Sequence, residues 1–95
     1  MYKLVVKPYA DRIFGKLAKK NRKQLEIINR KIGQIMENPH HGYKFLRSPL
    51  QGFNRVHIDR HFVLVFKIIH SEEAVEVWYY GHHDEIYKGK FLSQE

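Results

Sequence analysis

The sequence predicts one α+β domain over residues 1–95, in the order β-α-α-β-β-β(-α), with a helical hairpin packed on a small, mainly antiparallel twisted sheet. Two observations predict this fold. Residues 9–37 carry apolar side chains at helical spacing, and residues 53–80 hold three apolar runs joined by short connections. Ninety-five residues, 43% of them apolar, are enough for one core and too few for two.

The first half of the chain predicts a strand followed by two helices. Residues 2–6 form a short β-type run, and residues 9–19 place their apolar side chains on one helical face. Asn21 is a suitable N-cap for a second helix over residues 21–37, with Gln24 three positions later as in a capping box. Because almost nothing joins the two helices, we expect an antiparallel hairpin that covers one face of the sheet.

The second half predicts a loop and then a three-stranded meander. Glycines and a proline mark residues 40–52 as a loop, which we expect to be the most flexible segment. Residues 53–59, 62–69 and 74–80 read as antiparallel strands, and the middle one is apolar throughout, as a central strand covered on both faces would be. One helical turn should follow over residues 83–87. The sheet face opposite the helices is then free to serve as a concave working surface.

Charge is distributed unevenly along the chain, whose net charge is +7. Residues 1–38 carry ten Lys or Arg against three acids, residues 39–71 carry five against one, and residues 72–95 carry two against six. A basic body of this kind attracts polyanions, nucleic acid first. The outward basic face of the helical hairpin is either a solvated surface or a contact surface for RNA phosphates or an acidic partner, with Lys19, Lys20 and Lys23 as the candidates for RNA binding.

Metal and cofactor chemistry is not expected. The chain has no cysteine, so it has neither a thiolate metal site nor a thiolate nucleophile. The neighbouring pairs His40-His41 and His82-His83 match no familiar zinc spacing, and neighbours on an extended chain point apart.

The amino-terminal residues do not resemble a signal peptide. The longest apolar run there is residues 4–6, far short of the roughly 7 to 15 residues that such a peptide needs. No window approaches the roughly 20 apolar residues of a membrane span. We therefore expect a cytoplasmic protein that does not enter a membrane.

Residues 53–87 gather five of the seven histidines and the most reactive combination of side chains. Strand alternation should point Arg55, His57 and Asp59 to one face, and one helical turn should project His83 and Tyr87 together. Metal-free cleavage of RNA needs a base for the 2′-hydroxyl, an acid for the departing 5′-oxygen and a cation for the phosphoryl oxygens. Imidazoles and a guanidinium supply these three functions near neutral pH.

Further side chains are candidates for holding RNA. Tyr87 or Phe62 could hold a base by stacking, and Arg60 and His61 precede Phe62 at the start of the central strand. The alternative for each is structural: a single strand histidine is commonly a hydrogen-bonded surface residue, and His61 could simply belong to a turn. The sequence does not say which histidine is the base and which the acid.

The order of elements, together with HIDRHFVLVFKI (residues 57–68) and GHHDEIY (residues 81–87), resembles the RelE/ParE superfamily of bacterial and archaeal toxins. These proteins are the toxic halves of type II toxin–antitoxin pairs. The resemblance implies a microbial-ribonuclease-like fold that enters the ribosomal A site and cuts mRNA there without a metal. It also implies a RelB-like antitoxin as partner in a hetero-oligomer, besides the ribosome and mRNA.

Carried over by position, the resemblance implies catalytic roles for Arg55, His57, His83 and Tyr87, in the manner of the histidine-using YafQ branch. One position departs from the pattern: many RelE-type members have Arg on the central strand where this chain has Val63, so Arg55 or Arg60 would have to supply the cation.

Two other functions are compatible with the sequence. One is a ParE-like toxin that inhibits DNA gyrase and is not a nuclease. The other is a non-catalytic RNA-binding or ribosome-binding protein.

Overall fold

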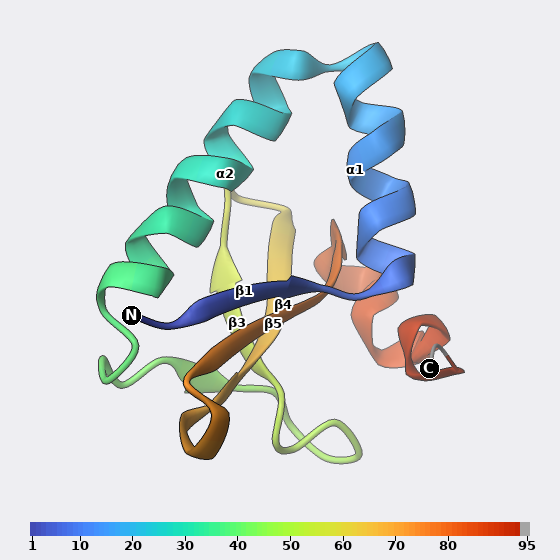
Figure 1. Ribbon diagram of the computed structural model, residues 1–95. Coiled ribbons are helices and arrows are strands. Elements are labelled where there is room, and N and C mark those ends of the chain that lie inside the picture. Colours follow the sequence, from blue (N-terminus) through green and yellow to red (C-terminus); the bar gives the residue numbers. More distant parts are fainter. Residues whose placement is uncertain (94–95) are drawn as a thin grey trace.

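Two helices cover one face of a five-stranded sheet in the computed structural model, which describes residues 1–93 (Figure 1). The helices are α1 (Pro8–Lys20) and α2 (Arg22–Glu37). The strands are β1 (Lys3–Val6), β2 (Lys44–Phe45), β3 (Asn54–His57), β4 (Phe62–Ile69) and β5 (Ala74–His82). Three short 3-10 segments are η1 (His70–Glu72), η2 (His83–Lys88) and η3 (Lys90–Ser93).

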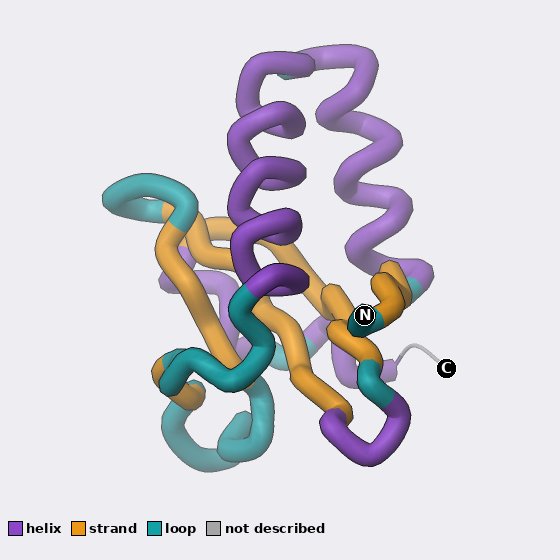
Figure 2. Tube along the Cα trace, turned by 60° about the vertical axis from the view of Figure 1, so that its left-hand side comes forward, coloured by secondary structure: helices purple, strands orange, loops and turns teal. Residues whose placement is uncertain are grey.

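The sheet has the order β1-β5-β4-β3-β2. Strand β1 pairs in parallel with β5, and every other pair is antiparallel, so the expected α+β fold with a mainly antiparallel sheet is confirmed. The connection between α1 and α2 is the part of the hairpin farthest from the sheet, as Figure 2 shows.

The helices begin where local chemistry favours it. Pro8 occupies the first turn of α1, where a missing N–H costs no hydrogen bond. At α2 the Asn21 side chain accepts a hydrogen bond from the backbone N–H of Gln24 at 3.2 Å, as expected for an N-cap. The Gln24 side chain does not close a capping box. Instead its amide donates to the hydroxyl of Tyr80 and, at 3.4 Å, to Asp59, which ties α2 to the sheet.

Strand β4 is covered on both faces, as its apolar sequence predicts. Leu64 and Phe66 belong to the core beneath the helices, together with Ala10, Ile28, Ile32, Ile35, Val75 and Val77. Val63 and Val65 point the other way, into a second core with Leu46, Leu50, Phe53, Ile86 and Phe91. Burying a side chain of this size stabilises the fold by roughly 1.5–3 kcal/mol.

This second core corrects the expectation of a bare sheet face opposite the helices. The segment that should have been a loop, residues 40–52, contributes β2, which pairs with β3, and lays Leu46 and Leu50 over the sheet. The segment after β5 covers the rest through Ile86 and Phe91. Two buried valines on this face explain the difference, because an apolar sheet face left in water would be unfavourable.

The carboxyl-terminal segment differs from the expected α-helical turn. Residues His83–Lys88 form a 3-10 helix, which begins after His82, whose Nδ1 accepts a hydrogen bond from the backbone N–H of Asp84 at 3.1 Å. Among residues 1–93, no helix combines the length and the apolar character that crossing a membrane requires.

Candidate active site

A cavity of about 470 Å³ lies where β3, the 46–47 segment and η2 meet. Its floor is apolar, formed by Leu46, Val63 and Ile86, all of them buried. Its walls are polar and mostly basic: Arg47, Arg55, His57, Arg60, His83, Asp84 and Tyr87. A cavity with this lining favours an anionic ligand.

Strand β3 supplies one wall. Arg55 and His57 are two residues apart on the strand and therefore share a face, where Arg55 Nη1 lies 3.3 Å from His57 Nδ1. A guanidinium can only donate, so Nδ1 of His57 accepts and the neutral ring carries its proton on Nε2. His57 is exposed and Arg55 half-buried, which leaves both within reach of a ligand.

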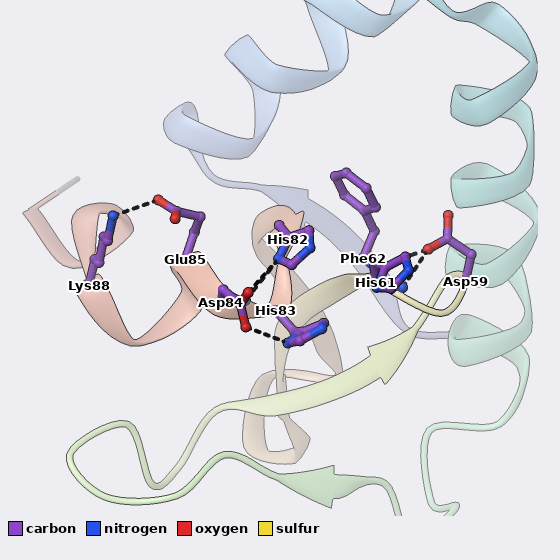
Figure 3. Close-up of polar contacts among 8 residues, drawn as sticks. All are labelled: Asp59, His61, Phe62, His82, His83, Asp84, Glu85 and Lys88. Carbon is purple, nitrogen blue, oxygen red and sulfur yellow. Dashed lines mark hydrogen bonds and ion pairs between the residues drawn. The ribbon is translucent and has the colours of Figure 1, made fainter.

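The start of η2 supplies a further part of the wall. His83 Nδ1 lies 3.0 Å from Asp84 Oδ1, so the carboxylate can accept the Nδ1 proton and leave Nε2 of the neutral ring as a proton acceptor. Figure 3 shows this pair. The two imidazoles thus have complementary partners, one facing a cation and the other an anion.

Tyr87 has a structural contact besides its place in the cavity wall. Its hydroxyl accepts a hydrogen bond from the backbone N–H of Arg47 at 2.8 Å, and the Arg47 guanidinium lies 5.3 Å from the centre of its ring. This contact holds the 46–47 segment against η2. The ring is 38% exposed, so one part of it can still meet a ligand.

The structure therefore brings together Arg55, His57, Arg60, His83 and Tyr87, which the sequence analysis selected. It does not place His61 or Phe62 in the cavity wall. His61 stacks on the imidazoles of His82, the last residue of β5, and His83, the first of η2. The Phe62 ring packs against Tyr80, with 5.5 Å between ring centres, and joins the core beneath the helices.

Two further predicted placements differ. Lys19, Lys20 and Lys23 flank the α1–α2 connection, the upper end of the hairpin in Figure 1, and none of them lines the cavity. Asp59 lies beyond the end of β3 and does not share the face of Arg55 and His57. Its Oδ1 accepts from the backbone N–H groups of His61 (2.9 Å) and Phe62 (3.0 Å), and the first of these bonds is the main cause of its lowered pKa.

The sequence analysis missed Arg47 and Asp84 as parts of the cavity wall. Asp84 follows His83 directly, and this adjacency was a usable signal. No local signal marks Arg47, because its position depends on how residues 46–53 fold back over the sheet.

Comparisons with known proteins identify relatives over the full length of the chain. A protein from Methanocaldococcus jannaschii, provisionally named toxin RelE4, is 45% identical over 95 residues, which is 100% of both chains. An uncharacterized protein from Methanosarcina mazei is 53% identical over 87 residues, covering 92% of this chain and 100% of the relative. No family model matches the sequence.

Solved structures share the fold at lower sequence identity. A YoeB/ParE toxin from Agrobacterium tumefaciens aligns with a TM-score of 0.76 at 20% identity, covering 85% of this chain and 98% of the other. A metal-bound toxin from Helicobacter pylori aligns with a TM-score of 0.76 at 20% identity, covering 90% of this chain and 99% of the other. A YoeB-YefM complex from Staphylococcus aureus aligns with a TM-score of 0.73 at 20% identity, covering 87% of this chain and 98% of the other.

The mixed sheet, the helical hairpin and the basic cavity define a small toxin-like α+β protein, and the full-length relatives narrow this class to a family. The chain belongs to the RelE/ParE superfamily, the toxins of toxin–antitoxin systems. The catalytic and RNA-binding roles of individual residues stay predictions.

Proposed function

We propose that this toxin is a ribosome-dependent endoribonuclease that cuts mRNA in the A site through attack by the 2′-hydroxyl. The observation that carries the proposal is that His57 and Arg55 of β3, His83 of η2 and Arg60 line the same cavity. General acid, general base and cation are then available in one place, and no metal is needed for the step.

The hydrogen-bond partners favour different roles for the two histidines. His83, with Nδ1 directed at Asp84, takes the 2′-hydroxyl proton at Nε2. The 2′-oxygen then bonds to phosphorus, and the bond from phosphorus to the 5′-oxygen breaks. The departing 5′-oxygen takes a proton from Nε2 of His57 in its imidazolium form, which becomes neutral imidazole. In that form Nδ1 also carries a proton, so the contact with Arg55 has to open before the step. The products are a 2′,3′-cyclic phosphate and a 5′-hydroxyl end.

Because this chain has Val63 where many RelE-type members have Arg, other arginines have to supply the cation. Val63 is 2% exposed and lies in the cavity floor, so it can position the substrate only by shape. Arg55, Arg60 and Arg47 surround it with cations that remain charged at every relevant pH. Charge developing on the phosphoryl oxygens would be stabilised by these side chains.

The expected partners follow from the same proposal. The mRNA would be the substrate and the ribosome the partner on which it is cut, so we expect the protein to act in the cytoplasm. A RelB-like antitoxin would restrain it in a hetero-oligomer. One similar structure is a toxin–antitoxin complex, YoeB-YefM. An acidic or amphipathic antitoxin segment would suit the basic surface, and β1 and β2 offer sheet edges to which it could add a strand.

Mapping of mRNA 5′ ends in translating ribosomes tests the proposal with the double variant His57→Ala, His83→Ala. The wild type should produce A-site cuts with 5′-hydroxyl ends, and the double variant should stay folded and lose activity by about 100-fold or more, since general acid–base groups contribute that much each. His70→Ala, an exposed histidine outside the cavity, is the matched control and should cut like the wild type.

The other outcomes identify the alternatives. Equal cutting by wild type and double variant would reject the site assignment. DNA breaks without mRNA cuts would favour a gyrase inhibitor. Toxicity that survives the double variant but falls when Lys19, Lys20 and Lys23 are neutralised would favour a binding protein.

A further inference from the structure

Three imidazoles from two distant segments meet beside the cavity. His61 lies in the turn between β3 and β4, His82 ends β5, and His83 begins η2. The pairing of Phe62 with His82 brings the segments together, and the backbone N–H of His83 donates to the carbonyl of His61 at 2.8 Å. One ring nitrogen of each histidine lies within 4.8 Å of one in both others (Figure 3).

We propose that His61, His82 and His83 form a binding site for a divalent transition-metal ion of the zinc, nickel or copper class. Imidazole nitrogen is a preferred ligand of these ions, whereas Mg²⁺ and Ca²⁺ select oxygen. Three histidines also leave a fourth coordination position open for water or a further ligand.

The site needs only small side-chain movements to close around an ion. Nitrogens that ligate one zinc ion tetrahedrally at about 2.0–2.1 Å lie roughly 3.3 Å apart, so the rings have to approach by up to about 1.5 Å. The rings already lie face to face, with centres 4.6 Å apart for His82 and His83 and 5.6 Å for His61 and His82. The side chains of His82 and His83 are 37% and 44% exposed, so they can turn, and solvent ions can reach them.

Asp84 is placed to support two of the ligands. Its Oδ1 lies 3.0 Å from Nδ1 of His83, and its Oδ2 lies 3.6 Å from Nδ1 of His82. A carboxylate that accepts Nδ1–H orients an imidazole for metal binding through Nε2. His82 Nδ1 accepts from the backbone N–H of Asp84, so ligation through Nε2 requires the ring proton to move to Nδ1 and this hydrogen bond to break. A small turn of the ring then brings Nδ1–H to Oδ2, which lies 3.6 Å away.

This arrangement explains why the sequence alone argues against a metal. The expectation rested on adjacent histidines pointing apart along an extended chain, but the change from β5 to η2 between His82 and His83 turns their rings together. His61 supplies the third ligand from more than twenty residues away. The other stacked pair, His40 and His70, has Tyr2 as its third ring and therefore provides an internal comparison.

One consequence rests on the proposed nuclease function. Nε2 of His83 is the nitrogen that would both ligate the ion and accept the 2′-hydroxyl proton. An ion held by the three histidines would occupy that nitrogen and block cutting, so the metal would act as an inhibitor of this site.

Metal binding is tested first, without RNA. Titration calorimetry of the purified chain with Zn²⁺, and visible absorption with Co²⁺, should show one tightly bound ion per chain. His61→Gln and His82→Asn should each weaken binding at least about tenfold; the asparagine keeps an acceptor for the Asp84 N–H but has no Nε2. Asp84→Asn should weaken it by about 10 to 100-fold, as loss of a supporting carboxylate does.

The controls are His40→Gln and His70→Gln, which remove a stacked histidine elsewhere and should bind Zn²⁺ like the wild type. Equal losses in the controls and in the ligand variants, or no saturable binding by the wild type, would overturn the proposal. Circular dichroism of each variant shows that the fold is retained.

A second measurement separates this proposal from the nuclease function. If both hold, Zn²⁺ should inhibit mRNA cutting by the wild type but not by His82→Asn, whose altered residue lies outside the cavity wall. Zn²⁺ binding without any cutting under metal-free conditions would reject the nuclease and keep the metal site. Cutting that Zn²⁺ inhibits equally in both proteins would reject inhibition through this site.

Discussion

At the scale of single residues, Gly81 is required by a close approach. It lies near the end of β5 opposite Val63, and a Cβ atom there would be 2.5 Å from the hydroxyl oxygen of Tyr79. The Tyr79 ring cannot simply move away, because it stacks on Phe91 with 5.2 Å between ring centres and also contacts Tyr9. The missing side chain therefore allows Tyr79 to hold the carboxyl-terminal segment on the sheet.

We predict that Gly81→Ala lowers the free energy of unfolding by about 1–3 kcal/mol, the usual effect of overpacking a well-filled site. Urea unfolding followed by circular dichroism measures it. Gly33→Ala is the control, because nothing lies within 4 Å of a Cβ at that helical position and alanine should stabilise the helix by up to about 1 kcal/mol. A neutral effect at Gly81 would show that Tyr79 gives way freely.

At the scale of elements, the segment after β5 acts as a lid on the second core and as a wall of the cavity. Phe91 of η3 is 1% exposed and meets Phe53 edge to face, with 5.4 Å between ring centres. Ile86 of η2 is equally buried, while its neighbour Tyr87 binds the backbone of Arg47. A change that destabilises this segment should therefore also change the position of His83.

Phe91→Ala should lower the free energy of unfolding by about 3–5 kcal/mol, because it removes a buried aromatic ring and leaves a cavity. Leu92→Ala, one residue away but 46% exposed, should change it by no more than about 0.5 kcal/mol. Thermal unfolding of the two variants provides the comparison. Similar values for both would mean that η3 does not anchor the fold.

Tyr87 combines a ring in the cavity wall with a hydroxyl that binds Arg47, and two variants separate these roles. Tyr87→Phe keeps the ring and removes a hydrogen bond of about 1 kcal/mol, so mRNA cutting should fall by no more than about tenfold. Tyr87→Ala removes the ring as well and should reduce cutting further if the ring holds a base. Equal activities of the two variants would assign Tyr87 to the hydroxyl contact alone.

At the scale of the whole molecule, the basic charge is divided between two places. One is the cavity with its arginines, and the other is the α1–α2 connection with Lys19, Lys20 and Lys23. None of the three lysines lines the cavity, although Gln24, next to Lys23, contacts Asp59, the neighbour of the cavity residue Arg60. The lysines are therefore better suited to a second contact, with ribosomal RNA or with an acidic partner.

Replacing all three lysines with glutamine should weaken ribosome binding and make it less dependent on salt. Each lost contact to single-stranded RNA reduces the slope of log K against log salt by about 0.7, so three contacts reduce it by about two. Binding measured at several salt concentrations gives the slope. An unchanged slope would show that these lysines do not touch RNA and face solvent or the antitoxin.

The site was predictable to the extent that it lies on regular elements. Strand alternation was enough to put Arg55 and His57 on one face, and the position of His83 after the last strand was enough to suggest its proximity. Arg47 could not be found in this way, because its segment has no period. The His61 contacts were missed for a related reason: they join two segments through β-sheet pairing that local patterns do not specify.

The sequence by itself determined which segments are helices and strands, which sides of them are apolar, and the family to which the chain belongs. The elements and their apolar sides depend on residues a few positions apart in the chain, so periodicity and capping reveal them. Only the tertiary structure decided that residues 46–53 and the segment after β5 close over Val63 and Val65 and so set Arg47 and Asp84 in the cavity wall. It also decided that His61, His82 and His83 meet beside the cavity. The physical reason is that burial of an apolar sheet face selects its covering from the whole chain, irrespective of distance along the sequence.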